Sequence, residues 1–503
     1  MDIDGLFRSP GNKLAQFSRI QTLLYRKDPS WQDYFQPLQM DLLTSQRASR
    51  ANRPSTNQIL TSGIRLAEKA RIVGSHRRIK TDVLICPNQY FGRETETQLF
   101  IRTVLGVAAT GAKILCLIPV DAPCRTELDR RLDAAGRAGQ VEFLDPAFVA
   151  NRVERRLRWN VAHNRGTAAF NHAVEILEPH ELSVGEEIRR EFGRRAYAID
   201  AWERLAPWIE FDIAIVRCHW FEFASSICRT ARQRGKLSIT FQQGVVGHSL
   251  DLPVTAKKFV SFGACSSSFL ERANRRFFQS VGAAEMPVEY VDGGCIIDKI
   301  LDLPDQFDNR TLLMVDVPTG QSNFYGVERQ GSALLQLADK LLSADLPLRR
   351  VIIRPHPFWN DLDFEECKRL AREYPNRCEL SHPAWSLEDD LRRSSAVAGI
   401  YSGVLTVASA SGLPTVFLQT EGGYSTGDLE CFSPAQTLLP DDAFCMLSRI
   451  LTDRKEYEAA RAQALCNARS YYKDGKTLDL NGDFFARLFK TEIAASQPKE
   501  AVQ

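Results

Sequence analysis

The stretch Val397-Ala-Gly-Ile-Tyr-Ser-Gly-Val-Leu-Thr-Val-Ala-Ser-Ala-Ser-Gly-Leu-Pro-Thr-Val-Phe417 decides the fold class, because it contains a strand, a helix and a second strand in immediate succession. A first apolar run ends at Tyr401, small residues then open a helix that closes at Gly412, and a second apolar run follows from Thr415. Strands that alternate with helices are typical of a parallel sheet covered by helices. The stretch therefore predicts an α/β fold.

The same alternation extends in both directions along the chain. Short apolar runs of the kind that form buried parallel strands recur on either side of a polar, turn-prone segment at residues 297–310. This pattern predicts two Rossmann-like doubly wound domains, preceded by a helical N-terminal extension. The predicted divisions are a basic helical segment at 1–80, a first domain at 81–300, a second domain at 301–490 and a tail at 491–503. The expected strands lie at residues 81–87, 112–119, 140–144, 211–216, 236–241, 258–263, 288–291, 311–317, 350–354, 396–400 and 415–418.

The composition of the 503 residues is that of a globular protein, with 44% hydrophobic and 25% charged residues, which excludes disordered, collagenous and coiled-coil proteins. The net charge of +2 excludes a nucleic-acid polycation. Twelve cysteines without a C-x-x-C pair indicate buried thiols in a reducing compartment, not a disulfide framework or a zinc site. Apolar stretches such as Ile114–Val120 are too short to span a membrane, and the start lacks a secretion signal. We therefore expect a soluble, cytoplasmic protein.

Residues Thr44–Lys80 contain nine basic side chains and a single acid, Glu68. Two interpretations are open. The segment is a solvated helical face, or it docks on an anionic acceptor polymer or an anionic membrane, in peripheral contact with the inner membrane surface.

The segment Val351-Ile-Ile-Arg-Pro-His-Pro-Phe358 brings Arg354 and His356 to the carboxyl end of an expected strand. Pro355 and Pro357 restrict the backbone on both sides of the histidine. An arginine fork and an imidazole N–H suit a phosphate or diphosphate. The alternative is a histidine that makes a structural hydrogen bond in a turn.

The helix that follows Tyr401 begins with Ser402 and Gly403. Its exposed amides, together with the hydroxyls of Ser402 and Thr406, would form a cradle for an anion. The alternative is an ordinary capped helix of a β-α-β unit. Because both segments follow strands of one domain, together they predict a nucleotide phosphate site.

A glycine-rich segment at residues 420–428 follows the last expected strand. It predicts a loop that closes on the ribose or base, with Glu421 accepting hydrogen bonds from ribose hydroxyls, or else a plain surface loop. The sequence has no G-x-x-x-x-G-K-[ST] loop and no strand-linked G-x-G-x-x-G, which argues against ATP hydrolysis and NAD binding. The Asp-x-Asp pairs at Asp2-Ile-Asp4 and Asp361-Leu-Asp363 suit a chain terminus and a first helical turn, so no metal site is predicted.

The order strand–His-Pro, then strand–Ser–helix–Gly-x-Pro–strand, resembles the second domain of GT-B glycosyltransferases. It is most similar to bacterial sialyltransferases and capsule Kdo transferases, which use CMP-activated acidic sugars, and CDP-glycerol phosphotransferases share the layout. The resemblance implies that His356, Pro357 and Ser402 bind the phosphate of a cytidine nucleotide. It covers the second domain to about Leu418, and the first domain only in general architecture.

Two positions depart from these families. Many members have a pair of serines where this chain has Ser402-Gly403. They also carry an acidic-acidic-Gly motif at a strand end of the first domain, where one acid is the general base. The comparable segment here is Gln242-Gln243-Gly244, and a neutral amide does not accept a proton.

Transfer to a hydroxyl still needs a base within hydrogen-bond reach. His248, in the same glycine-flanked loop, is the first candidate, and its alternative is a structural hydrogen bond. Glu94 and Glu96, in the loop after the first strand, are the second candidates, although both also suit the first turn of a helix. Asp292 is the third candidate, and it also suits a turn. His219 and Glu222, which flank Trp220 after another strand, would line the acceptor site, and burial against the core is the alternative.

The resemblance and the motifs together predict an inverting, metal-independent glycosyltransferase without a cofactor. It would move a nonulosonic acid or Kdo from a CMP-linked donor to a surface glycan or glycoprotein acceptor. His248 would deprotonate the acceptor hydroxyl, while His356 and Ser402 stabilise the leaving phosphate. Alternatives are a CDP-polyol phosphotransferase, a UDP-sugar transferase or epimerase of the same fold, and a non-catalytic glycan- or nucleotide-binding subunit.

Overall fold

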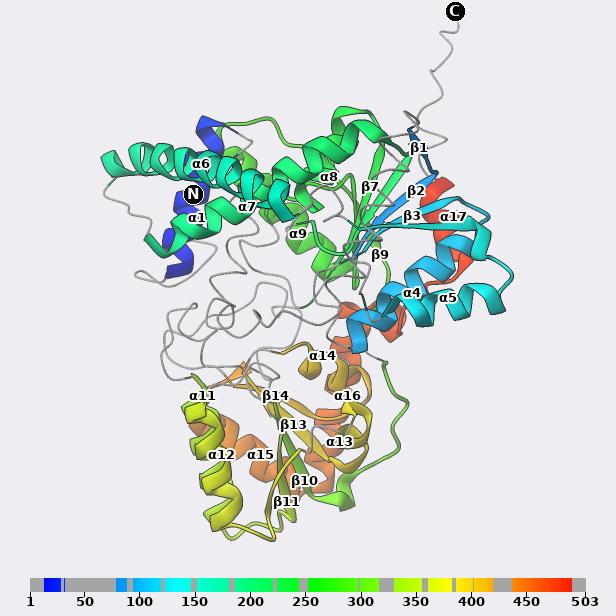
Figure 1. The fold of residues 1–503 in the computed structure, drawn as a ribbon. Coiled ribbons are helices and arrows are strands. Elements are labelled where there is room, and N and C mark those ends of the chain that lie inside the picture. Colours follow the sequence, from blue (N-terminus) through cyan, green and yellow to red (C-terminus); the bar gives the residue numbers. More distant parts are fainter. Residues whose placement is uncertain are drawn as a thin grey trace, which may run out of the picture.

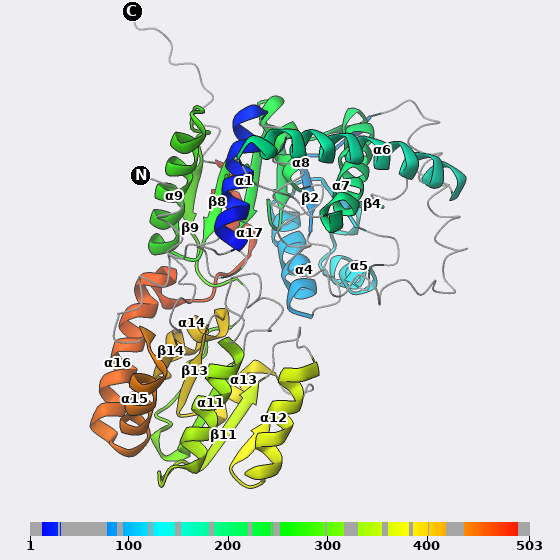
Figure 2. The same cartoon turned by 90° about the vertical axis from the view of Figure 1, so that its left-hand side faces the viewer.

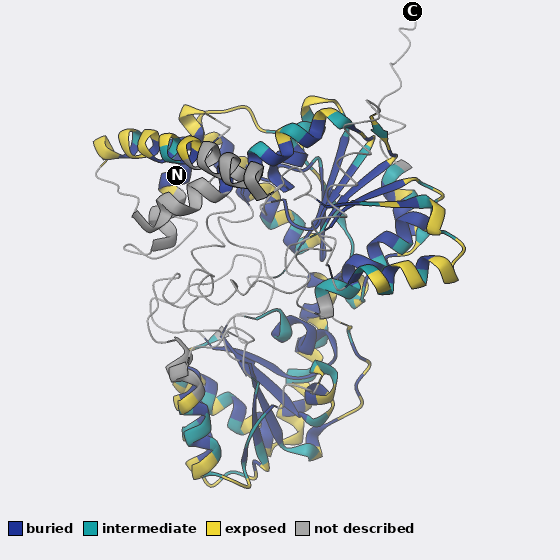
Figure 3. Ribbon diagram, viewed as in Figure 1, coloured by how far each residue is buried: buried dark blue, intermediate teal, exposed yellow. Residues whose placement is uncertain are grey.

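The computed structural model contains two α/β domains, one above the other in Figure 1. Most strands of both sheets are buried beneath their helices (Figure 3), whereas the edge strand β9 (Glu289–Asp292) is partly exposed. The structure describes residues 13–28, 31, 78–87, 94–118, 122, 124–145, 152–180, 186–219, 224–242, 244, 252–296, 299–315, 330–354, 361–381, 386–400, 402–418 and 437–490.

The described strands of the first domain form a seven-stranded sheet in the order β4-β3-β2-β6-β7-β8-β9, and every pair is parallel. The chain starts in the middle of this sheet, builds one half outward and returns to build the other. The strand order therefore reverses between β2 and β6, and such switch points are where doubly wound sheets bind ligands. The strands are β2 (Val83–Cys86), β3 (Ile114–Leu117), β4 (Val141–Leu144), β6 (Ile213–Val216), β7 (Leu237–Phe241), β8 (Lys258–Ser261) and β9 (Glu289–Asp292).

Successive side chains of β2 enter two different cores, because strand residues alternate between the faces of a sheet. Val83 and Ile85 belong to the cluster beneath α4 and α5, whereas Leu84 and Cys86 belong to the cluster with Trp202. Both faces are thus covered, which explains why the strands are continuous apolar runs. The helices of this domain are α4 (Glu94–Ala109), α5 (Cys124–Ala134), α6 (Arg152–Leu177), α7 (Glu186–Leu205), α8 (Ala224–Gln233) and α9 (Ala264–Val281).

The described strands of the second domain form a six-stranded parallel sheet in the order β12-β11-β10-β13-β14-β15. Its switch point lies between β10 and β13, where Gly399 allows close approach, because a Cβ atom there would lie 2.6 Å from the carbonyl oxygen of Val315. The strands are β10 (Thr311–Val315), β11 (Arg350–Arg354), β12 (Cys378–Leu380), β13 (Ala396–Gly399), β14 (Thr415–Leu418) and β15 (Thr437–Leu438). The helices are α11 (Gln330–Ser343), α12 (Asp361–Glu373), α13 (Leu387–Arg393), α14 (Gly403–Ala410), α15 (Pro440–Thr452) and α16 (Arg454–Tyr471).

After α16 the chain returns to the first domain, which differs from the predicted extent of 301–490 for the second. The last helix, α17 (Gly482–Lys490), packs against α4, where a Cβ atom at Gly106 would lie 2.2 Å from the carbonyl oxygen of Leu480. The buried ammonium group of Lys258 donates to the carbonyl oxygen of Leu488, 3.1 Å away, near the end of α17. The aromatic and aliphatic face of α17 therefore completes the core of the first domain.

The helical N-terminal extension is confirmed by α1 (Lys13–Lys27), which packs against α6 and α9. Tyr25 contacts the ring of Phe277 edge-on, with the centroids 5.3 Å apart. Helices α6 and α7 lie side by side (Figures 1 and 2). Residues 44–77 of the predicted basic segment lie outside the described residues, as does the tail at 491–503. A short pair of parallel strands, β1 (Ile79–Lys80) and β5 (Ile209–Glu210), comes directly before the paired strands β2 and β6.

Eight described cysteines are free and buried, and Cys445 and Cys466 are free and exposed. Cys265 is disulfide-bonded, which corrects the expectation that the cysteines are thiols throughout. Within the described ranges, no helix combines the length and the apolar character that crossing a membrane requires.

Candidate active site

The carboxyl ends of the strands in each domain point toward the other domain. The two switch points therefore lie on the edges of the domains that face each other (Figure 1). In the first domain the relevant residues follow β2, β6 and β7. In the second they follow β10, β11 and β13. Ligands of doubly wound sheets bind at such carboxyl ends, which makes this region the candidate site.

A buried ion pair marks the switch point of the first domain. Arg217, directly after β6, binds both carboxylate oxygens of Glu96 on α4, with Nε–Oε2 and Nη2–Oε1 distances of 3.1 and 3.3 Å. The two side chains are 7% and 12% exposed. Burial lowers the pKa of Arg217, but the charge of Glu96, the neighbouring Cys218 and the hydrogen bonds to Glu96 together outweigh it, so the pKa lies above its ordinary value. The guanidinium is therefore charged, and it holds the start of α4 against the sheet.

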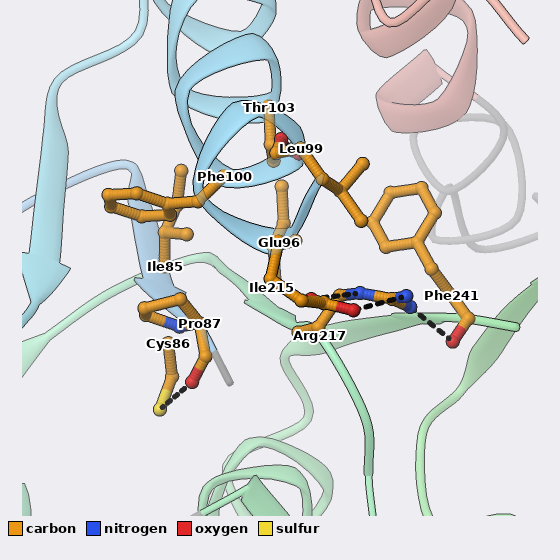
Figure 4. A pocket seen from close by; sticks show the side chains of 10 residues that line it. All are labelled: Ile85, Cys86, Pro87, Glu96, Leu99, Phe100, Thr103, Ile215, Arg217 and Phe241. Carbon is orange, nitrogen blue, oxygen red and sulfur yellow. Dashed lines mark hydrogen bonds and ion pairs between the residues drawn. The ribbon is translucent and has the colours of Figure 1, made fainter. Parts of the chain in front are cut away.

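Arg217 also binds the end of the neighbouring strand. Its Nη1 donates to the carbonyl oxygens of Phe241 and Gln242, at 3.4 and 3.1 Å. The pair borders a small pocket whose other walls are apolar, with Phe241 on one side and Phe100 on the other (Figure 4). The space is about 20 Å³, which is room for about one water molecule. A sugar does not fit inside it, so an acceptor would bind outside this pocket.

These contacts bear on the predicted role of Glu96 as a base. Both carboxylate oxygens already accept hydrogen bonds from Arg217, in a bidentate geometry that fixes the orientation of the side chain. The geometry therefore gives Glu96 a positioning role that the sequence alone did not indicate. The side chain of Glu94 lies outside what the structure describes.

Gln242 lies directly after β7, and both ends of its side-chain amide form hydrogen bonds. Its Oε1 accepts from the backbone N–H of Phe262 at 2.7 Å, and its Nε2 donates to the carbonyl oxygen of Gly244 at 2.8 Å and to Ser266 Oγ at 3.2 Å. The side chain is fully buried. It joins the end of β7 to the start of α9, which is a structural function. Gln243 and the predicted base His248 lie outside the described residues.

The other candidates of the first domain are also held by neighbours. His219 is buried and contacts the ring of Phe259 edge-on, with the centroids 5.9 Å apart, in line with the alternative of burial. Asp292 accepts from Ser267 Oγ at 2.6 Å and thereby fixes the end of β9 to α9. Glu222 lies outside the described residues. Burial raises the pKa of the Cys86 thiol, which borders the small pocket, to about 12, so this thiol is not a nucleophile near neutral pH.

In the second domain, Ser402 caps α14 as predicted. Its φ of −156° is extended, and its Oγ accepts from the backbone N–H of Val404 at 3.2 Å. A Cβ atom at Gly403 would meet nothing within 4 Å, so open space lies beside the first residue of the helix. A helix start with a hydroxyl cap and an open approach suits an anion. Figure 1 places α14 at the edge of the second domain that faces the first.

Thr406 does not contribute to this cradle in the way predicted. Its side chain is fully buried, and its hydroxyl donates to the carbonyl oxygen of Gly403 at 2.7 Å and lies 2.6 Å from Tyr472 Oη. The tyrosine follows α16, so the hydroxyl lies on the packed side of α14. The physical reason is that Thr406 lies one turn into the helix, where Tyr472 packs against it and takes up its hydroxyl.

Arg354 lies at the end of β11, as predicted, but part of its guanidinium is already bound. Nη1 lies 2.5 Å from a carboxylate oxygen of the fully buried Asp390 and 3.3 Å from Ser381 Oγ. The side chain is 26% exposed, so it retains access to solvent at the strand end. His356, Pro357 and Glu421 lie outside the described residues, and their roles stay predictions. In the part of the chain that is described, no three His, Cys, Asp or Glu residues form a potential metal site.

Comparison with known proteins identifies the fold. No protein-family model and no curated protein matches the sequence. An α,α-trehalose 6-phosphate synthase from Burkholderia multivorans matches the structure with a TM-score of 0.50 at 13% identity, over 85% of this chain and all of that one. A glycosyltransferase from Rickettsia africae matches at 0.46 and 12% identity, over 83% of this chain and all of that one. HepE from Anabaena in complex with UDP matches at 0.43 and 9% identity, over 82% of this chain and all of that one.

At such identities the likeness shows the fold alone. It agrees with the two parallel sheets of this chain. The protein has the two-domain Rossmann-like architecture of the GT-B fold.

Proposed function

We propose that the protein is a glycosyltransferase that binds the phosphate of a nucleotide sugar at the start of α14. The observation that carries the proposal is the position of Ser402 and Gly403 at the switch point of the second domain. There the helix presents a capping hydroxyl, and among the described residues nothing lies within 4 Å of a Cβ atom placed at Gly403. The backbone amides of the helix start would hold the negative charge that develops as the nucleotide leaves.

The donor is proposed to be a CMP-linked acidic sugar, because the His-Pro and Ser-helix order resembles transferases that use such donors. The acceptor is a surface glycan or glycoprotein. Its hydroxyl attacks the anomeric carbon, the bond to the nucleotide phosphate breaks, and direct displacement inverts the anomeric centre. His248 takes the hydroxyl proton, and His356 and Ser402 contact the departing phosphate. The ion pair of Arg217 and Glu96 keeps the edge of the first domain in place.

The first test measures thermal stability with CMP, CDP, UDP, GDP and ADP, in the wild type and in Ser402→Ala. A ligand at about one hundred times its dissociation constant adds about 2.7 kcal/mol to native stability. Ser386→Ala is a matched control, because Ser386 also caps a helix of this domain, accepting from the backbone N–H of Asp389 at 3.2 Å. Both variants lose a cap, worth about 0.5–2 kcal/mol, but only Ser402→Ala should lose nucleotide binding.

The nucleotide that stabilises the protein distinguishes the alternatives. Selective binding of CMP supports the acidic-sugar donor. Selective binding of UDP indicates a UDP-sugar enzyme, and selective binding of CDP indicates a CDP-polyol phosphotransferase. Release of the free nucleotide together with an extended acceptor establishes transfer, and an altered sugar nucleotide indicates an epimerase. Binding without turnover indicates a non-catalytic subunit. Equal binding by wild type and Ser402→Ala would remove the proposed phosphate site.

A further inference from the structure

A second hollow lies at the opposite end of the second domain, where β10 and β11 begin and α13 ends. It measures about 290 Å³, against the ~10–15 Å³ that one water molecule needs. The candidate donor site lies at the carboxyl ends of the strands of this sheet, and the hollow lies at their amino ends. The length of the strands therefore separates the hollow from the donor site (Figure 1). The hollow is lined by Asn309, Thr311, Arg349, Arg350, Ile352, Arg392 and Arg393.

The charges around this hollow do not balance. Arg350 and Arg393 share one carboxylate, Glu379, with N–O distances of 2.6 and 2.8 Å. Arg392 pairs with Glu388 at 2.7 Å. Among the described residues, no carboxylate lies within ion-pair distance of Arg349, which is exposed. Asp389 also interacts electrostatically with Arg392 and Arg393. Among the described residues, four guanidinium groups therefore face three carboxylates, which leaves a local excess of about one positive charge.

The dipole of α13 accounts for only part of this arrangement. Arg392 and Arg393 lie in the last turn of the helix, where cations are favourable. Arg349 and Arg350 lie at the start of β11, so the dipole of α13 does not explain their positions. They nevertheless line the same hollow. The side chains of Arg350, Arg392 and Arg393 are 39%, 49% and 34% exposed. The exposed guanidinium groups of Arg349 and Arg392 can therefore reach a ligand in the hollow.

Arginine forks of this kind match the geometry of phosphate oxygens. Asn309 and Thr311 add polar groups on the β10 side, and Ile352 adds an apolar one. We infer that this hollow is a binding site for a small molecule that carries several phosphate charges, such as pyrophosphate or a sugar phosphate. The site is separate from the nucleotide site, and it does not depend on the proposed transferase activity.

The test is calorimetric titration of the full chain with inorganic pyrophosphate, and separately with glucose 6-phosphate, at physiological ionic strength. Arg349→Ala combined with Arg392→Ala removes two cations whose side chains lie at the surface, so the fold should persist. Arg369→Ala is the matched control. Arg369 lies on α12 of the same domain, is 37% exposed and pairs with Glu366, but does not line the hollow. Thermal unfolding of each variant confirms that the native state is retained.

We expect saturable binding of at least one phosphate ligand to the wild type, weakened by about tenfold or more in the double variant, because charge-assisted hydrogen bonds are lost. The control should bind within about twofold of the wild type, and sulfate should bind at least about tenfold more weakly than pyrophosphate. The tighter of the two phosphate ligands identifies the source. Absence of saturable binding, equal losses in the control, or equal binding of sulfate would overturn the inference.

The variant Gly403→Leu, which alters the start of α14, distinguishes binding in the hollow from binding at the proposed nucleotide site. The inference requires that this variant binds pyrophosphate as the wild type does, whatever it does to nucleotides. Loss of pyrophosphate binding in Gly403→Leu, with binding retained in the arginine double variant, would place the ligand at α14 and refute the second site.

Discussion

Two glycines four residues apart, Gly399 and Gly403, should respond in opposite ways to the same substitution. A Cβ atom at Gly399 would lie 2.6 Å from the carbonyl oxygen of Val315 and 3.3 Å from both methyl groups of Leu405. The obstacle is partly backbone, so Gly399→Ala should destabilise the protein by about 1–3 kcal/mol. At Gly403 nothing lies within 4 Å, and alanine forms helices better than glycine. Gly403→Ala should therefore leave stability unchanged or raise it by up to about 1 kcal/mol.

At Gly403, a larger side chain should impair nucleotide binding although it does not impair stability. If a nucleotide phosphate approaches the start of α14 through this open space, a larger side chain there competes with it. Gly403→Leu should retain the stability of the wild type and weaken nucleotide binding by about tenfold or more, the loss of one good polar contact. Denaturant unfolding measures the stability, and the nucleotide-dependent shift in melting temperature measures binding.

Two results would refute this reasoning. A folded Gly403→Leu variant with wild-type nucleotide affinity would show that the ligand does not use this space. Destabilisation by Gly403→Ala as large as that by Gly399→Ala would show that the packing around α14 differs from the structure. The Ser386→Ala variant controls for changes in helix capping elsewhere in the domain.

Three further predictions concern the framework around the site. Arg217→Met should lower the free energy of unfolding in denaturant by about 3–5 kcal/mol, because it leaves the buried charge of Glu96 unpaired, and adding Glu96→Leu should restore much of the loss. If the destabilisations of the two single variants simply add in the double variant, the ion pair is contradicted. Above pH 9, Cys86 should lower the free energy of unfolding by up to about 1.4 kcal/mol per pH unit, because its thiol ionises near pH 9 in the unfolded state but only near 12 in the native state. If the free energy of unfolding of Cys86→Ala falls with pH as steeply as that of the wild type, this assignment is contradicted. Tyr472→Phe should cost about 1 kcal/mol, and a double-mutant cycle with Thr406→Val should show that the two changes are not additive; independent effects would deny the hydrogen bond.

The sheets were largely predictable from the sequence, because buried parallel strands are short apolar runs that helices separate. The expected strand at 350–354 coincides with β11, and the others overlap the observed strands. The strand β12, whose sequence Cys-Glu-Leu is only three residues long, was not predicted, and neither was the two-residue β15. Both lie on the outer side of the sheet order, where pairing to one neighbour places less demand on sequence.

The candidate site was predictable in part. The cap at Ser402 follows from local chemistry, since a serine before an apolar helix satisfies its first amides. The ion pair between Arg217 and Glu96 was missed, because it joins residues 121 positions apart. One signal was present, namely an arginine directly after the apolar run 213–216, at the carboxyl end of a strand. Long-range pairing also decides the place of Thr406, whose partner Tyr472 is 66 positions away.

Long-range contacts of the same kind also connect the C-terminal residues, which the sequence pattern assigns to the second domain up to residue 490, with the first domain. The chain leaves the second domain through α16, and its next residues pack against the first domain: the rings of Phe262 and Tyr472 lie 5.3 Å apart. Tyr472 bonds the buried hydroxyl of α14, while Gln242 holds the backbone of Phe262. Arg217 in turn donates to the carbonyl oxygen of Gln242. Contacts therefore run without a break from the helix that begins at the candidate phosphate site to the ion pair of the first domain. No local pattern encodes such a connection, because each step joins elements that only the folded chain brings together.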